Sequence, residues 1–124
     1  MKINTPRGTG KKILIVEDDE DFLSILKIKF ISEGFSIVTA KNGEEGIIMA
    51  EKEKPDLIIS DILMPIIGGI EMANKIKESN KDVQMLFLTN IQDADSVKNF
   101  DYLIKADLRI DEIVEKVKIK LGVK

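Results

Sequence analysis

Short hydrophobic runs alternate with segments of helical periodicity along most of this chain. The runs are continuous rather than interleaved with polar residues, which is what a strand needs when both faces of its sheet are covered. Three of the runs are clear and two are weaker: Ile13–Val16, Leu57–Ile59 and Met85–Leu88, then Phe35–Thr39 and Tyr102–Ile104. The pattern predicts five strands in a parallel sheet.

Four other segments repeat apolar residues at helical spacing, and residues with known preferences for helix ends border them. Asp19 and Asn42 suit the starts of two helices, Gly34 and Gly122 suit helix ends, and Pro55 stops a helix before it. The predicted helices cover residues 20–33, 42–53, 70–79 and 109–121. Strands that alternate with helices predict a doubly wound α/β fold.

Composition fits one folded domain. The chain has 124 residues, of which 44% are hydrophobic and 33% are charged, and its net charge of −3 gives no sign of a nucleic-acid surface. No hydrophobic run approaches the roughly 18 residues of a membrane span, so we expect a cytoplasmic protein that uses no membrane. Residues 1–11 lack periodicity and are expected to form a disordered lead-in, with one domain over residues 12–124.

The chain contains no cysteine and no histidine. Disulfides, thiolate metal sites, imidazole metal ligands and histidine acid–base catalysis are therefore excluded within it. Any chemistry must use carboxylates, hydroxyls, lysines and oxygen-bound metal ions.

Polar residues follow the predicted strands where each strand ends. Parallel strands bring their carboxyl ends to one edge of the sheet, where ligands bind in this class of fold. A lone acidic residue in such a place is more often a helix cap or a solvated loop residue, and Asp19 suits the cap. Asp61 is different, because an unpaired carboxylate beside a central strand is costly. The residues that follow the strands are Glu17, Asp18, Asp19, Asp61, Thr89 and Lys105.

Clustered carboxylates repel one another, and a hard divalent cation relieves that repulsion. An oxygen-only site with few protein ligands suits Mg²⁺, which keeps part of its water shell and shares sites with phosphate. A lysine opposite supplies charge for an anion, and a threonine hydroxyl supplies a hydrogen-bond donor. Together these groups predict phosphoryl transfer with a carboxylate as the nucleophile.

The segments ILIVEDDEDFL, PDLIISDILMPIIGG, LFLTN and DYLIKADL resemble, in this order, the receiver domain of bacterial two-component response regulators. The resemblance covers about residues 12–121 and implies a five-stranded flavodoxin-like fold with strand order 2-1-3-4-5. It implies that Asp61 is the phosphoacceptor and that Glu17, Asp18, Asp61 and the carbonyl of Leu63 bind Mg²⁺. It also implies that Thr89 is the switch hydroxyl, that Lys105 pairs with the phosphoryl group and that Tyr102 reports the state.

The implied partners are a histidine kinase or a phosphotransfer protein, whose phosphohistidine would donate to Asp61. Unless the chain is a fragment of a longer regulator, its effect must be passed to an unidentified output protein or to a homodimer. The implied activity is that of a switch and not an enzyme, with at most slow phosphorylation from small donors and slow loss of the phosphoryl group.

Two features depart from this family. Ala106 stands where the family usually has proline after the lysine, often with a cis peptide bond, which is improbable before alanine. Only residues 90–100 separate Thr89 from the fifth strand, near the lower limit for a crossover between parallel strands. We therefore expect a shortened or absent fourth helix and an exposed sheet face near Phe87 and Leu103.

Two other functions remain open from the sequence. A degenerate receiver could act as an interaction scaffold without phosphorylation, which the short segment favours. An aspartate-nucleophile phosphohydrolase would need a second aspartate two residues after Asp61, and Leu63 stands there.

Overall fold

The computed structural model describes residues 8–90 and 100–123. Its five strands are β1 (Lys12–Val16), β2 (Ser36–Ala40), β3 (Leu57–Asp61), β4 (Gln84–Thr89) and β5 (Asp101–Ile104). Its helices in the described part are α1 (Glu20–Ser32), α2 (Gly43–Glu53), α3 (Gly69–Ser79) and α4 (Ile110–Leu121), with a short 3-10 turn at Lys105–Asp107.

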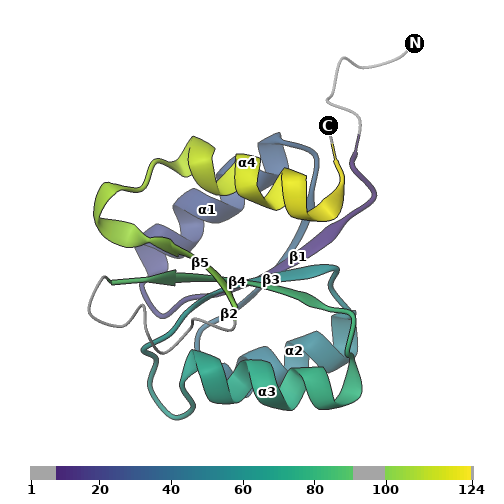
Figure 1. Cartoon of the computed structure of the whole chain (residues 1–124), viewed down its shortest axis with the longest axis vertical. Helices are drawn as coiled ribbons and strands as arrows, with labels where there is room; N and C mark the ends of the chain where they lie inside the picture. Colours follow the sequence, from purple (N-terminus) through teal and green to yellow (C-terminus); the bar gives the residue numbers. More distant parts are fainter. Residues whose placement is uncertain (1–7, 91–99, 124) are drawn as a thin grey trace.

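The strands form one parallel sheet in the order β2-β1-β3-β4-β5. Helices α1 and α4 cover one face and α2 and α3 cover the other (Figure 1). This is the predicted doubly wound, flavodoxin-like α/β fold, and every predicted strand is present. The central strands β1, β3 and β4 are buried on both faces, which explains their continuous hydrophobic runs.

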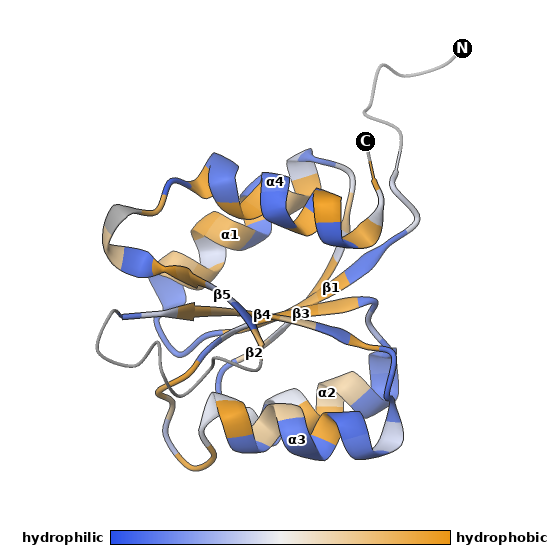
Figure 2. Cartoon of the chain, viewed as in Figure 1, coloured by the Kyte–Doolittle hydropathy of each residue, from blue (hydrophilic) through white to orange (hydrophobic). Residues whose placement is uncertain are grey.

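The hydrophobic core is divided by the sheet into two clusters. Leu14, Ile58 and Phe87 point toward α2 and α3, whereas Ile15, Ile59 and Leu88 point toward α1 and α4. Figure 2 shows the central strands as mostly hydrophobic and the helices as a mixture of hydrophobic and hydrophilic residues. Because successive side chains of a strand point to opposite faces of the sheet, each central strand contributes residues to both clusters.

The ends of the helices follow the predicted signals. The side chain of Asp19 accepts hydrogen bonds from the backbone of Asp21 and Phe22, and Asn42 accepts one from Glu45. At the other ends, Gly34 and Gly122 take positive φ angles of 94° and 67°, which glycine adopts without steric cost. The predicted boundaries agree with the observed ones to within one or two residues.

The expected exposure of the sheet near Phe87 is wrong. Phe87 is fully buried, and the ring of Phe100 packs edge-on against it at 5.2 Å between ring centroids. Leu103 does not share that face, because it pairs with Leu88 in the sheet and packs on the side of α1 and α4. The prediction of a shortened or absent helix concerns residues 91–99, which lie outside the described part.

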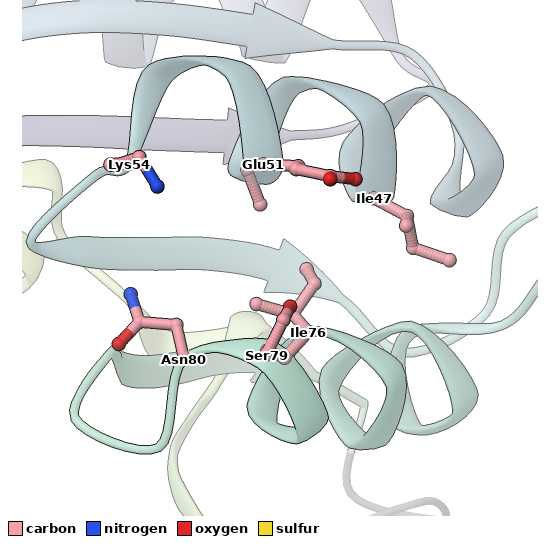
Figure 3. A pocket seen from close by; sticks show the side chains of 7 residues that line it. Ile47, Glu51, Lys54, Ile76, Ser79 and Asn80 are labelled. Carbon is pink, nitrogen blue, oxygen red and sulfur yellow. The ribbon is translucent and has the colours of Figure 1, made fainter.

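A hollow of about 370 Å³ lies between α2 and α3 (Figure 3). Ile47 and Glu51 of α2, with Lys54 directly after that helix, face Ile76 and Ser79 of α3 across it. It lies where these helices end and the next strands begin, so it is at the opposite edge of the sheet from the predicted site.

Among the described residues, no helix combines the length and the apolar character needed to cross a bilayer.

Candidate functional site

The carboxyl edge of the sheet gathers the residues that the strand ends supply. Glu17 and Asp18 follow β1, Asp61 is the last residue of the adjacent β3, Thr89 ends β4, and Lys105 follows β5. Lys105 is the first residue of the turn after β5, and its ammonium contacts both Asp61 at the end of β3 and Glu17 after β1.

Asp61 and Lys105 form an ion pair. The Nζ atom of Lys105 lies 3.0 Å from Oδ2 of Asp61, while Oδ1 of Asp61 accepts a hydrogen bond of 2.7 Å from the backbone N–H of Ile62. The desolvation cost of placing a carboxylate at a buried strand end is therefore offset by a cation and a backbone donor. Both side chains keep some contact with solvent, with side-chain exposures of 28% for Lys105 and 19% for Asp61.

Glu17 is the most buried carboxylate of the site, with 3% of its surface exposed. Its Oε1 lies 3.3 Å from the Nζ atom of Lys105, and its Oε2 accepts a long hydrogen bond of 3.4 Å from the backbone of Asp19. Burial raises the pKa of Glu17 above its ordinary value, and the attraction of Lys105 offsets this only in part. Burial alone would lower the pKa of Lys105, but Asp61 and Glu17 outweigh it and raise that pKa.

The acidic residues fit a divalent cation. Carboxylate oxygens of Glu17, Asp18 and Asp61 lie within 4.8 Å of one another. Three carboxylates against the single ammonium of Lys105 leave two negative charges, which a dication would balance. All the donors are oxygen atoms, as Mg²⁺ prefers. The carbonyl of Leu63 belongs to the loop that follows Asp61, and its part in metal binding stays a prediction.

The loop after Asp61 is held tightly against the end of β3. The backbone N–H of Gly69 donates to the carbonyl of Ile62 at 2.7 Å, and that of Ile67 donates to the carbonyl of Pro65 at 2.9 Å. Ile66, which lies between Pro65 and Ile67, has a φ of 73°, and this conformation is costly for a β-branched residue. The strain is concentrated in the segment that carries the exposed side chain of Leu63.

Thr89 and Tyr102 are placed differently from the four charged residues. Thr89 is buried at the end of β4, and its hydroxyl donates to the carbonyl of Asn90 at 3.1 Å. Tyr102 lies on the edge strand β5, paired in register with Phe87, and is 38% exposed. In this conformation the threonine hydroxyl is bonded to its own loop, and the tyrosine is partly at the surface.

The sequence did not indicate that Phe22 belongs to the site. Its ring lies below the ammonium of Lys105, 5.2 Å from Nζ to the ring centroid. Phe22 lies in the first turn of α1, which begins at the same edge of the sheet directly after Glu17, Asp18 and Asp19. That position was the only feature of the sequence that could have indicated Phe22 as part of the site.

The peptide bonds around Lys105 are trans, and the turn Lys105–Asp107 closes with a hydrogen bond from Leu108 to the Lys105 carbonyl.

Chemically, this arrangement can hold an oxyanion between a cation site and an ammonium, with a carboxylate in reach as a nucleophile. Asp61 is the candidate for that nucleophile, because it makes the shorter of the two carboxylate contacts with Lys105, at 3.0 Å, and lies beside Glu17 and Asp18. Metal and lysine would share the negative charge on a phosphoryl group. The described part of the site contains no second aspartate in the place that a hydrolase of the aspartate-nucleophile type needs.

Comparison with known proteins agrees with this geometry. The family described as "Response regulator receiver domain" matches residues 13–118. The alkaline phosphatase synthesis transcriptional regulatory protein PhoP of Bacillus subtilis is 33% identical over 107 residues, which are 86% of this chain and 42% of PhoP. The chain thus spans less than half of the length of this relative.

Solved structures with the same fold include response regulators. TrrA of Thermotoga maritima, crystallised in complex with Mg²⁺-BeF, superimposes with a TM-score of 0.80 at 35% identity and covers 88% of this chain and 97% of TrrA. A receiver domain protein from Clostridium thermocellum, at 22% identity, has a TM-score of 0.84 over 90% of this chain and 94% of that one, which supports the fold alone.

Proposed function

The chain belongs to the response regulator receiver domains, and we propose on this basis that it is a phosphoacceptor switch of a two-component system, with Asp61 as the acceptor. The observation that carries the proposal is the contact of Asp61 with Lys105 at 3.0 Å, beside the carboxylates of Glu17 and Asp18. The donor would be the phosphohistidine of a kinase or of a phosphotransfer protein. The chain itself has no histidine.

In the transfer step, a carboxylate oxygen of Asp61 forms a bond to phosphorus. The bond from phosphorus to the donor's imidazole nitrogen breaks, and its electron pair stays on that nitrogen, which then takes a proton from water. The ammonium of Lys105 would stabilise the negative charge of the phosphoryl oxygens as the group approaches Asp61. Mg²⁺, bound by Glu17, Asp18, Asp61 and the Leu63 carbonyl, would supply further charge neutralisation. The oxygen chemistry and the charge of the acidic group support this assignment.

The switch step would begin at Thr89. Its hydroxyl now donates to the carbonyl of Asn90, and we propose that it turns to donate to a phosphoryl oxygen once Asp61 is modified. Thr89 pairs with Ile104 in the sheet, and Tyr102 lies two residues before Ile104 on the same strand. A conformational change at Thr89 would therefore alter the surface formed by β4 and β5, where Tyr102 is partly exposed.

The receiver family is one of signalling domains, and we propose that this chain passes its signal to another protein or to a second copy of itself. We propose slow loss of the phosphoryl group as its only turnover, no direct contact with nucleic acid or membrane, and a cytoplasmic location. The net charge of −3 is consistent with the absence of nucleic-acid binding.

The proposal is tested by incubating the protein with acetyl phosphate, with and without Mg²⁺, and by measuring the intact mass. We expect one phosphoryl group per chain, only when Mg²⁺ is present. The matched control is Asp61→Asn, which keeps the shape of the side chain and removes the nucleophile. A folded protein that never gains mass would instead be the scaffold, and catalytic turnover of simple phosphoesters would indicate the phosphohydrolase.

A further inference from the structure

The described residues around Lys105 hold it by a short turn and a few side-chain contacts. The turn that carries it, Lys105–Asp107, has three residues and one closing hydrogen bond. Beside its side chain is a cavity of about 290 Å³ lined by Asp19, Phe22, Leu108, Ile110 and Ile113 as well as by Lys105. A lysine side chain has four rotatable bonds, so packing on this side does not by itself fix the position of the ammonium.

Within the part of the chain that the structure describes, three groups contact the ammonium of Lys105. Two of them are the carboxylates of Asp61 and Glu17, which are also the proposed acceptor and a proposed ligand of the cation. These carboxylates would also bind the cation and, at Asp61, the phosphoryl group, so during the reaction they would be less available to hold Lys105. The third is the ring of Phe22 at 5.2 Å, which has no other role in the site.

Phe22 is anchored by its backbone and by packing. Its backbone N–H donates to Oδ1 of Asp19 at 3.2 Å, in the cap of α1, and its side chain packs against the core cluster between the sheet and α1 and α4. The ring face offers the negative part of its quadrupole to a cation. The ring is partly buried against this cluster at the capped start of α1, so it can hold the ammonium on the side toward Asp61.

We propose that Phe22 is a positioning residue for Lys105, which keeps the ammonium against Asp61 by a cation–π contact rather than by packing alone. This inference rests on the proposed function insofar as it concerns the rate of phosphorylation. It explains how the chain fixes its lysine although Ala106 leaves the following turn without proline.

The test replaces Phe22 with phenylalanines that carry one, two and three ring fluorines, introduced at this position only. Fluorines weaken the negative ring face stepwise and leave the shape of the side chain almost unchanged. The rate of phosphorylation by acetyl phosphate with Mg²⁺ should fall stepwise, by about two- to five-fold over the series, as expected for a cation–π contact near the surface. The matched control is the same series at Phe30, whose ring packs on Phe35 in the core and should not affect the rate.

A second readout needs neither metal nor phosphorylation. In the metal-free protein, the ring of Phe22 should shift the NMR signals of the Lys105 side-chain methylene protons upfield, and Phe22→Leu should abolish that shift. Lys105→Arg identifies the signals by their loss. A flat rate over the fluorine series, or a Lys105 signal at its ordinary position, would overturn the proposal. If the wild-type protein is not phosphorylated at all, the proposed function fails, and the NMR result alone then decides the role of Phe22.

Discussion

Two adjacent glycines after the acceptor loop should respond in opposite ways to the same substitution. A Cβ atom built on Gly69 would lie 2.3 Å from the carbonyl oxygen of Asp61, 3.1 Å from Cα of Ile62 and 3.0 Å from the ring of Phe87. Two of these neighbours are backbone atoms, which cannot rotate away. Overpacking of a rigid site costs about 1–3 kcal/mol, and we expect Gly69→Ser to lie near 3 kcal/mol.

Gly68 has more room and a different role. Its Cβ would meet nothing closer than the Ile62 carbonyl at 3.4 Å, and its φ of −70° suits any residue. It occupies the N-cap of α3, where no side chain now accepts a hydrogen bond. Gly68→Ser would supply that acceptor and reduce the entropy of the unfolded chain, so we expect it to stabilise the protein by about 0.5 kcal/mol.

Urea unfolding followed by circular dichroism measures both variants against the wild type. With a slope of about 2 kcal/mol per molar urea, Gly69→Ser should lower the midpoint by roughly 1.5 M, and Gly68→Ser should raise it by roughly 0.2 M. Equal shifts of the two midpoints, or a larger loss at Gly68, would refute the close approach of Gly69 to the end of β3.

Three further predictions concern charge, metal and core. The hydrogen bond from Lys118 lowers the pKa of Glu33, so its stabilisation exists above the pKa of the unfolded chain and is lost as pH falls through the folded pKa. Glu33→Gln should then cost about 0.5 kcal/mol at neutral pH and nothing in acid, as urea titrations at the two pH values would reveal. Mg²⁺ at about 100 times its Kd should raise the free energy of unfolding by about 2.7 kcal/mol, and Asp18→Asn should remove most of this gain in a thermal melt; an equal gain in the variant would exclude Asp18 as a ligand. Phe30→Ala should cost about 3–5 kcal/mol in urea unfolding, because its ring is fully buried against Phe35; a cost below 1 kcal/mol would contradict that packing.

The sequence was sufficient to predict the sheet and most of the helices because their signals are local. Buried parallel strands require continuous apolar runs, and Asp19, Asn42 and Gly122 mark helix ends by their own side chains or by the lack of one. The convergence of Glu17, Asp18, Asp61 and Lys105 followed from topology, since parallel strands end at one edge. The roles of these residues still depend on the proposed function.

The parts that the sequence did not reveal depend on contacts between distant segments. The pairing of β4 with β5 puts Phe87 opposite Tyr102, so that Phe87 and Leu103 lie on different faces of the sheet, and a ring from Phe100 covers Phe87. The contact of Phe22 with Lys105 joins residues more than 80 positions apart. The left-handed conformation of Ile66 runs against the preference of a β-branched residue, so no local signal indicates it.

The central claim is that Asp61 carries an acyl phosphate. Borohydride reduces an aspartyl phosphate to homoserine, and this marks the modified residue permanently for peptide mass spectrometry. After incubation with acetyl phosphate and Mg²⁺, the account predicts homoserine at position 61, and at no other aspartate, with none in the Asp61→Asn control. Homoserine at another aspartate, or none in a wild-type protein that remains folded, would contradict it.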